Sequence, residues 1–152
     1  MTDGISKYEN VNVSTVDQGT LIIMAYEGAI GFVKIAKEKL AQNDYAGKSI
    51  NISNAVSIIN ELNARLNMEK GGETAKNLNK LYTFLSIHLT TANLKKDAHK
   101  LDESINILEN LLKGWRIIID KDKKSALEVS NADIKLPTGA GNPITGGLAI
   151  TA

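Results

Sequence analysis

The chain has 152 residues, a hydrophobic content of 43% and no cysteine, so it can form one domain with a core and cannot contain a disulfide or a thiolate metal site. Its 18 basic and 17 acidic residues give a net charge of +1, which excludes a strong field for nucleic acid or anionic lipid. The N-terminus lacks the basic and apolar regions of a signal peptide, and we expect a cytoplasmic protein with no membrane insertion.

Four segments with helical periodicity follow one another along the chain. The first begins at Asp17, whose side chain suits an N-cap, and ends at a break at Asn43-Asp44. Short connections between long helices make neighbouring helices antiparallel. We predict helices over residues 17–43, 45–67, 73–96 and 97–121, which close most simply into an all-α, antiparallel up-down four-helix bundle.

The pair Gly71-Gly72 separates the second segment from the third. One glycine can take the left-handed conformation that ends a helix, and the other leaves the next helix free to start. We therefore predict that this pair forms the turn of a helical hairpin.

Apolar residues recur at three- and four-residue steps in every segment, which places them on one side of a helix. The core stripe predicted for the first segment is Leu21, Met24, Gly28, Phe32 and Ile35. Those of the second and third are Ile52, Ala55, Val56, Ile59, Leu62 and Leu66, then Leu78, Leu81, Tyr82, Leu85, Leu89 and Ala92. That of the fourth is Leu101, Ile105, Leu108, Leu112, Trp115 and Ile119.

Two segments lie outside the predicted bundle, which spans residues 17–124. The N-terminal arm, residues 1–16, contains Ile5 and Tyr8 among enough apolar residues to dock against another surface. The C-terminal tail, residues 125–152, contains both prolines and is rich in Gly and Thr, so we expect it to be irregular. Its scattered apolar residues are compatible with a tail that lies in a groove.

No group of residues in the sequence supports catalysis. A di-iron site in a bundle needs Glu-x-x-His pairs, and no glutamate lies three residues before His88 or His99. Neither histidine is followed by the Lys and Gly that usually accompany a phosphotransfer histidine, and neither Gly-Gly pair matches a nucleotide fingerprint. We expect no cofactor, no metal and no enzymatic activity, with His88 at a boundary position and His99 in solvent.

The stronger signal is apolar surface beyond what a core needs. A bundle helix buries a stripe of about 100° or somewhat more, yet three segments carry additional apolar residues, mostly one heptad apart, off the predicted core side. These residues are Ile23 and Ile30, Ile87 and Leu94, and Ile107, Leu111 and Ile118. We predict that they contact a partner, unless the arm and the tail of the same molecule cover them.

Several motifs, in this order and spacing, resemble those of the FliS family of flagellar export chaperones. Met24 to Ile30 is similar to the family's M-L-Y-D-G-A-I motif, with Ala25 in place of the leucine. Gly71 to Tyr82 is similar to its G-G-E-x-A-x-N-L-x-x-L-Y motif. Ala92-Asn93 and the spacing from Leu108 to Trp115 match its later A-N and L-x-x-x-L-x-x-W patterns, and the arm residues Ile5 and Tyr8 resemble its export-related contacts.

The resemblance implies a cytoplasmic chaperone that binds the C-terminal segment of flagellin in hydrophobic surface grooves. Such a chaperone prevents premature polymerisation of flagellin and keeps it competent for export. The resemblance leaves open a second partner, either the flagellar export gate (FlhA) or a co-chaperone. Two other interpretations of the sequence stay open: a structural bundle that uses the same surfaces to self-associate, and a phosphotransfer four-helix protein.

Overall fold

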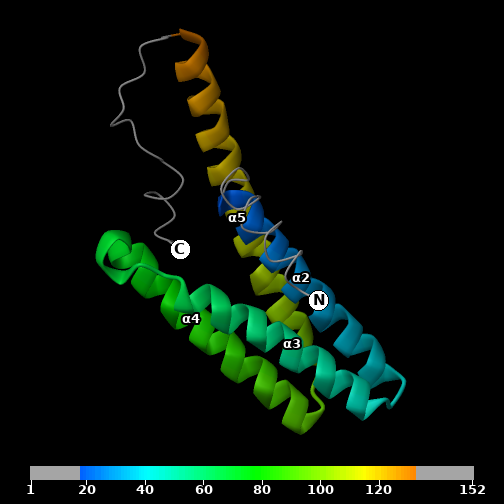
Figure 1. Ribbon diagram of the computed structural model, residues 1–152. Helices are drawn as coiled ribbons and strands as arrows, with labels where there is room; N and C mark the ends of the chain where they lie inside the picture. Colours follow the sequence, from blue (N-terminus) through cyan, green and yellow to red (C-terminus); the bar gives the residue numbers. More distant parts are fainter. Residues whose placement is uncertain (1–17, 133–152) are drawn as a thin grey trace, which may run out of the picture.

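A computed structural model of the chain describes the backbone of residues 18–132 and the side chains as far as residue 122. Its helices are α2 (Gln18–Ala41), α3 (Tyr45–Ala64), α4 (Met68–Lys95) and α5 (Ala98–Ala132). Helix α2 packs against α3 and α5, and α4 packs against the same two helices. Figure 1 shows successive helices running in opposite directions. The predicted all-α four-helix bundle is confirmed, whereas the predicted arm with Ile5 and Tyr8, the N-cap Asp17 and residues 133–152 lie outside the described part.

Local side-chain bonds set the turns between the helices. Asp44 caps α3, because its carboxylate accepts a hydrogen bond from the Gly47 backbone N–H at 2.9 Å. Asp97 does the same for α5, accepting from the Lys100 N–H at 3.2 Å. Asn43 and Lys96, each just before a capping residue, take positive φ values of 59° and 54°. The turns between α2 and α3 and between α4 and α5 therefore fall where the sequence predicts them.

The Gly71-Gly72 pair is not the turn between α3 and α4, and that prediction is wrong. Helix α3 ends at Ala64, and Asn67 already caps α4 by accepting from the Lys70 N–H at 2.9 Å. Because this side chain satisfies the first free N–H groups, a helical turn forms before the glycines. Gly72 then interrupts α4 with φ 54° and ψ −131°, so the glycine produces a kink within the helix.

Helix α5 continues beyond the predicted end at Lys121 and reaches Ala132. The sequence from Lys121 to Ala132 contains no Gly or Pro and includes good helix formers, so nothing in it ends the helix earlier. The predicted boundary between bundle and tail, at residues 124 and 125, therefore falls inside α5. In Figure 1 this part of α5 extends past the other helices.

Three aromatic side chains join three helices inside the core. The Tyr26 and Tyr82 hydroxyl oxygens lie 2.6 Å apart, and Trp115 Nε1–H donates to the Tyr26 hydroxyl at 3.0 Å. Both tyrosines are fully buried, and their burial raises the pKa of each hydroxyl above its ordinary value. Because these bonds link α2, α4 and α5, they fix the relative rotation of the helices as well as their contact.

The predicted core stripes of α3, α4 and α5 lie in or against the core except for Leu81, but the stripe predicted for α2 is wrong. Met24 and Ile35 are exposed, and the buried residues of α2 are Gly19, Ile22, Tyr26, Ala29, Ile30, Val33 and Ala36. Ile30 thus lies in the core rather than opposite it, and Ile23 is half-buried against the core. The face with Tyr26 and Val33 fills the interior.

The same apolar character makes α2 unusual among the described helices. It alone of them is long and apolar enough, by length and composition, to cross a membrane. The core helix of a soluble protein passes the same test, and α2 contributes the Tyr26 hydroxyl and several apolar side chains to the bundle interior. We therefore describe α2 as a core helix that is apolar on both of its faces.

Candidate functional site

An apolar surface runs along the side of α5 that faces α4. Glu103 identifies this side, because its carboxylate lies 2.9 Å from Nε2 of His88 on α4. Ile107, Leu111 and Ile118 follow Glu103 at steps of four and seven residues and therefore share its side of the helix. Ile107 and Leu111 are half-buried against the core, and Ile118 is exposed. Three of the predicted partner-binding residues thus lie along one line.

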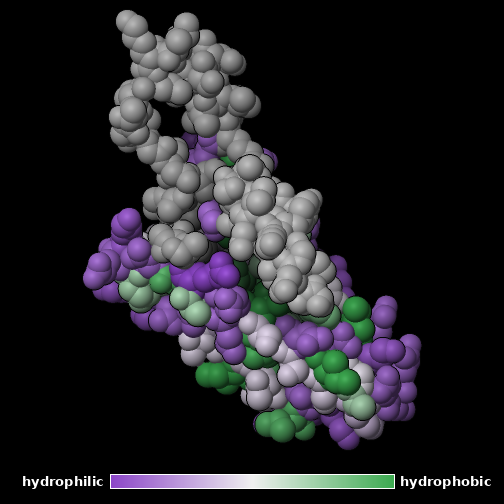
Figure 2. Space-filling model, viewed as in Figure 1, coloured by the Kyte–Doolittle hydropathy of each residue, from purple (hydrophilic) through white to green (hydrophobic). Residues whose placement is uncertain are grey.

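Helix α4 extends this surface outward. Ile87 and Leu94 are 63% and 79% exposed, as expected for residues off the core side. Phe84, which sequence reasoning missed, is exposed between them and α5, with its ring stacked on that of His88 at 4.8 Å between centroids. Figure 2 shows apolar side chains standing out among polar ones on the face of the bundle in view. We call Phe84, Ile87, Leu94, Ile107, Leu111 and Ile118 the α4–α5 surface.

Hydroxyl groups beside this surface are already hydrogen-bonded within α4. The Thr90 hydroxyl donates to the Ser86 carbonyl oxygen and the Thr91 hydroxyl to the Ile87 carbonyl oxygen, each at 2.8 Å. A partner that covers these threonines leaves both bonds intact, so burial carries little penalty for lost water contacts. This arrangement favours apolar binding over recognition by hydrogen bonds.

The position of α4 is fixed from α3 at the end nearest Leu94. Lys48 Nζ donates to the Asn93 carbonyl oxygen at 2.9 Å, and the Ser49 hydroxyl donates to Asn93 Oδ1 at 2.9 Å. The ammonium group thereby interacts with the negative end of the α4 dipole. Burial, and then the nearby charge of Lys96, lower the pKa of Lys48 below its ordinary value.

The two histidines have the positions expected from the sequence. The side chain of His88 is 14% exposed and bonded to Glu103, whereas that of His99 is 81% exposed and lies 3.5 Å from the other Glu103 oxygen. The His88 ring contacts Glu103 through Nε2 rather than Nδ1. No set of three or more His, Cys, Asp or Glu side chains among the described residues is arranged to hold a metal ion.

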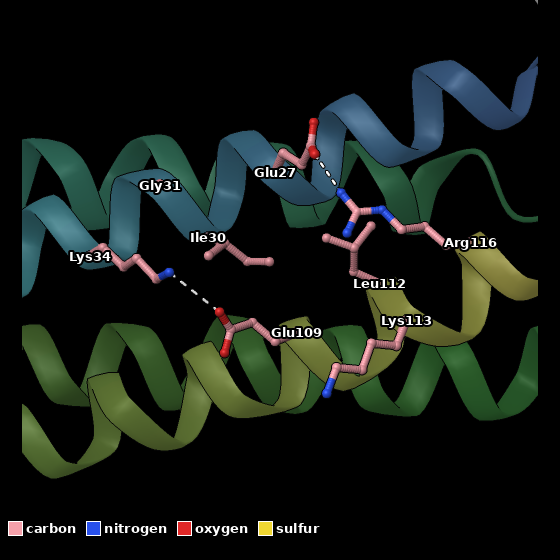
Figure 3. A pocket seen from close by; sticks show the side chains of 8 residues that line it. All are labelled: Glu27, Ile30, Gly31, Lys34, Glu109, Leu112, Lys113 and Arg116. Atoms are coloured by element: carbon pink, nitrogen blue, oxygen red, sulfur yellow. Dashed lines mark hydrogen bonds and ion pairs between the residues drawn. The ribbon is translucent and has the colours of Figure 1, made fainter.

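A second feature lies between α2 and α5. Ile30, Gly31 and Leu112 line a pocket of about 530 Å³, with charged residues around it (Figure 3). Ion pairs between Glu27 and Arg116 and between Lys34 and Glu109 stand at its two ends. Ile30, predicted as a partner contact, is thus a core residue whose edge reaches this pocket. Ile23 lies on the α5 side of the same helix and packs against the core.

Sequence reasoning missed seven of the ten large hydrophobic residues that are exposed in the described part of the chain. They are Met24, Ile35, Tyr45, Ile50, Met68, Phe84 and Ile117. The periodicity of α2 predicts a core position for Met24 and Ile35, because this helix has two apolar faces. Phe84 could have been found, because it lies three residues before Ile87 and therefore on a neighbouring part of the same helical side.

Together the fold and these surfaces define a helical bundle whose described residues expose apolar area on more than one side. The model of the family described as Flagellar protein FliS matches residues 1–122, so the chain belongs to the FliS family of flagellar secretion chaperones, which are not enzymes. The motifs that carry the resemblance include Tyr26, Tyr82 and Trp115, and the structure joins these three residues by hydrogen bonds.

Curated relatives support the same assignment. The chain is 37% identical over 123 residues to the Flagellar secretion chaperone FliS of Salmonella typhimurium, covering 78% of this chain and 91% of the relative. It is 32% identical over 119 residues to that of Vibrio cholerae, covering 76% and 88%. It is 28% identical over 117 residues to that of Bacillus subtilis, covering 77% and 86%.

Proposed function

We propose that this protein is a cytoplasmic export chaperone that holds the C-terminal segment of flagellin along the α4–α5 surface. Holding that segment prevents premature polymerisation and keeps flagellin competent for export. Membership of the flagellar secretion chaperone family supports the proposal. The observation that carries it is the set of Ile107, Leu111 and Ile118 on one side of α5, together with the exposed Phe84 and Ile87 on α4.

The energetics of this surface suit a flexible client. Full burial of an exposed Ile, Leu or Phe side chain contributes roughly 1.5–3 kcal/mol. The exposed residues Phe84, Ile87, Leu94 and Ile118 together offer several such contributions. Ordering a flexible segment costs about 2–5 kcal/mol or more of the gross interaction energy. The surface therefore offsets the ordering cost through apolar contact along its whole length rather than through one strong bond.

The remaining predicted contacts complete the proposal. Ile5 and Tyr8, in the N-terminal arm, are proposed to make export-related contacts, as the family resemblance implies. Ile23 and Ile30 are proposed as secondary contacts only, because the core covers most of their surface.

Isothermal titration calorimetry with a flagellin C-terminal peptide tests this function. We expect a one-to-one complex and a strongly negative heat-capacity change, because apolar burial produces that signature. No binding at micromolar peptide concentrations would refute the proposal.

A pair of matched variants tests the location of the site. Ile87→Ser, on α4, should weaken peptide binding by about tenfold, since it removes most of the apolar burial of one side chain. Ile50→Ser is the control, because Ile50 is 61% exposed on α3, close to the 63% of Ile87, but lies outside the α4–α5 surface. Equal weakening by the two variants would contradict the assignment of this surface.

A further inference from the structure

The pocket between α2 and α5 has a regular construction. Glu27 and Lys34 are seven residues apart on α2, and Glu109 and Arg116 are seven apart on α5. Because the two helices are antiparallel, Glu27 pairs with Arg116 and Lys34 with Glu109, and the Lys34–Glu109 distance is 3.3 Å. At a rise of 1.5 Å per residue, the two ion pairs enclose a slot about 10 Å long. The slot therefore has fixed ends.

The floor between these ion pairs is apolar and has a gap. Ile30 and Leu112 form it, with 7% and 6% of their surfaces exposed. Figure 3 shows both side chains between the two ion pairs, with Gly31 beside them on α2. A Cβ added to Gly31 would meet no atom within 4 Å, so the missing side chain leaves open space. A large side chain of another molecule can occupy that space.

The outer side of α2 carries apolar residues beyond both ends of this gap. Met24 and Ile35 are 59% and 40% exposed. At 100° per residue, Met24, Gly31 and Ile35 fall on the same side of α2, with the glycine between the two larger side chains. The helix surface is therefore low at Gly31 and raised at Met24 and Ile35. This shape matches the ridge of a helix that packs across α2, because helices pack by placing ridges into grooves.

The charges around the pocket indicate the sign of the charge that a partner should carry. Its lining contains three basic and two acidic residues, a net charge of +1. Four of the five are in the two ion pairs, and Lys113 forms no ion pair with any residue that the structure describes. An acidic group near Lys113 gains an attraction that no described residue supplies, whereas a basic group is repelled. The pocket is therefore complementary to an apolar side chain with a carboxylate close to it.

We infer that the α2–α5 face binds an acidic amphipathic helix of a partner protein, with a large apolar side chain in the pocket and a carboxylate at Lys113. Met24 and Ile35 contact the apolar residues on either side of that anchor. This face lies on the other side of α5 from the α4–α5 surface, because Glu109 pairs with α2 and Glu103 contacts α4. The protein can thus hold two partner segments at once, and the inference does not depend on where flagellin binds.

A defined pair of peptides tests this inference. The first is an alanine-based helix of about 16 residues with leucines at positions i, i+3 and i+7 and glutamates beside them. The second has lysine at each glutamate position, which preserves helix propensity and reverses the charge. Fluorescence anisotropy of labelled peptides measures the affinity of each for the full-length protein. We expect the acidic peptide to bind about tenfold more tightly at low salt.

Two glycine variants locate the binding site. Gly31→Leu places a large side chain in the open space at Gly31, where an added Cβ meets no atom within 4 Å, and should weaken binding of the acidic peptide by about tenfold or more. Gly114→Leu is the matched control, because Gly114 is also a helical glycine with open space around it but does not line the pocket. It should leave the affinity of the acidic peptide unchanged. Circular dichroism of both variants verifies that each is folded.

A charge variant tests the role assigned to Lys113. Lys113→Glu should abolish or reverse the preference for the acidic peptide, since it removes the one basic lining residue outside the ion pairs. Three results would overturn the inference: no binding of the acidic peptide at about 1 mM, equal affinity for both peptides in the unmodified protein, or equal effects of Gly31→Leu and Gly114→Leu. Binding of a flagellin peptide to the Gly31→Leu variant should be unchanged. This control distinguishes loss of the α2–α5 site from loss of the proposed flagellin site.

Discussion

Removing a single oxygen from the core has a different expected cost at Tyr26 than at Tyr82, although both tyrosines are fully buried. The Tyr26 hydroxyl is central, because it accepts from Trp115 Nε1–H at 3.0 Å and shares a 2.6 Å hydrogen bond with Tyr82. Tyr26→Phe therefore removes the acceptor of the Trp115 N–H and the hydroxyl that bonds Tyr82, and it leaves both groups unpaired unless Trp115 turns toward Tyr82. Tyr82→Phe leaves one at most, since Tyr26 keeps the bond from Trp115.

The magnitudes follow from the cost of an unsatisfied buried group, which is about 1–3 kcal/mol. Tyr26→Phe should lower the free energy of unfolding by about 2–6 kcal/mol and Tyr82→Phe by about 1–3 kcal/mol. The double variant should be no less stable than Tyr26→Phe, because the Tyr82 hydroxyl is no longer present to be left unpaired. The two effects are thus coupled rather than additive.

Urea unfolding followed by circular dichroism measures these differences. The three variants should shift the midpoint without changing the slope, since the surface exposed on unfolding is nearly the same. Equal costs for Tyr26→Phe and Tyr82→Phe would refute the reasoning, because they would show that Trp115 does not depend on Tyr26 as its acceptor. A strictly additive double variant would refute it as well.

Three further predictions concern pH, the kink in α4 and the length of α5. Burial raises the pKa of Tyr26 and Tyr82 in the folded state, so their contribution to the free energy of unfolding is complete below the ordinary value of 10.0 and is lost at higher pH. Urea midpoints should therefore fall as the pH rises above that value, and they should fall less steeply in the double Phe variant. Gly72→Ala should destabilise the protein by about 1–2 kcal/mol, because the backbone at Gly72 has a positive φ. Gly114→Ala should be neutral or should stabilise the protein by up to about 1 kcal/mol. Thermal unfolding measures both changes. Deleting residues 126–152 should change the free energy of unfolding of the bundle by no more than about 0.5 kcal/mol, since the buried α5 residues among those described end at Ile119. Urea unfolding measures the change, and an unfolded truncated chain would contradict the prediction.

Periodicity was sufficient to predict three of the four core faces. Helices α3, α4 and α5 have apolar residues on one side and polar ones opposite, as with Leu108 and Asn110. For such a helix only one rotation buries the apolar stripe. The exposure of Ile87, Leu94 and Ile118 follows from the same spacing. Their contact with a partner stays a prediction.

The position of the turn between α3 and α4 depends on which of two helix-interrupting residues ends the connection, and residue spacing alone does not predict this. Asn67 and Gly72 are both residues that interrupt helices, and they lie close together in the sequence. The structure uses the asparagine to cap α4 and the glycine to kink it. A side chain that satisfies the N–H groups of a helix permits the helix to begin earlier, so the cap determines the position of the turn.

Helix α2 could not be oriented from the sequence for a reason that also bears on function. Glu27 is its one charged residue before Lys34, so the apolar pattern alone does not select a face. The choice depends on partners from other helices: the hydroxyl and indole groups that meet Tyr26, and the α5 residues that pair with Glu27 and Lys34. Once those contacts turn Tyr26 inward, Met24 and Ile35 must face outward. A helix that is apolar on both faces can serve the core and still present a surface to another protein, and the pocket at Gly31 lies beside that outward face.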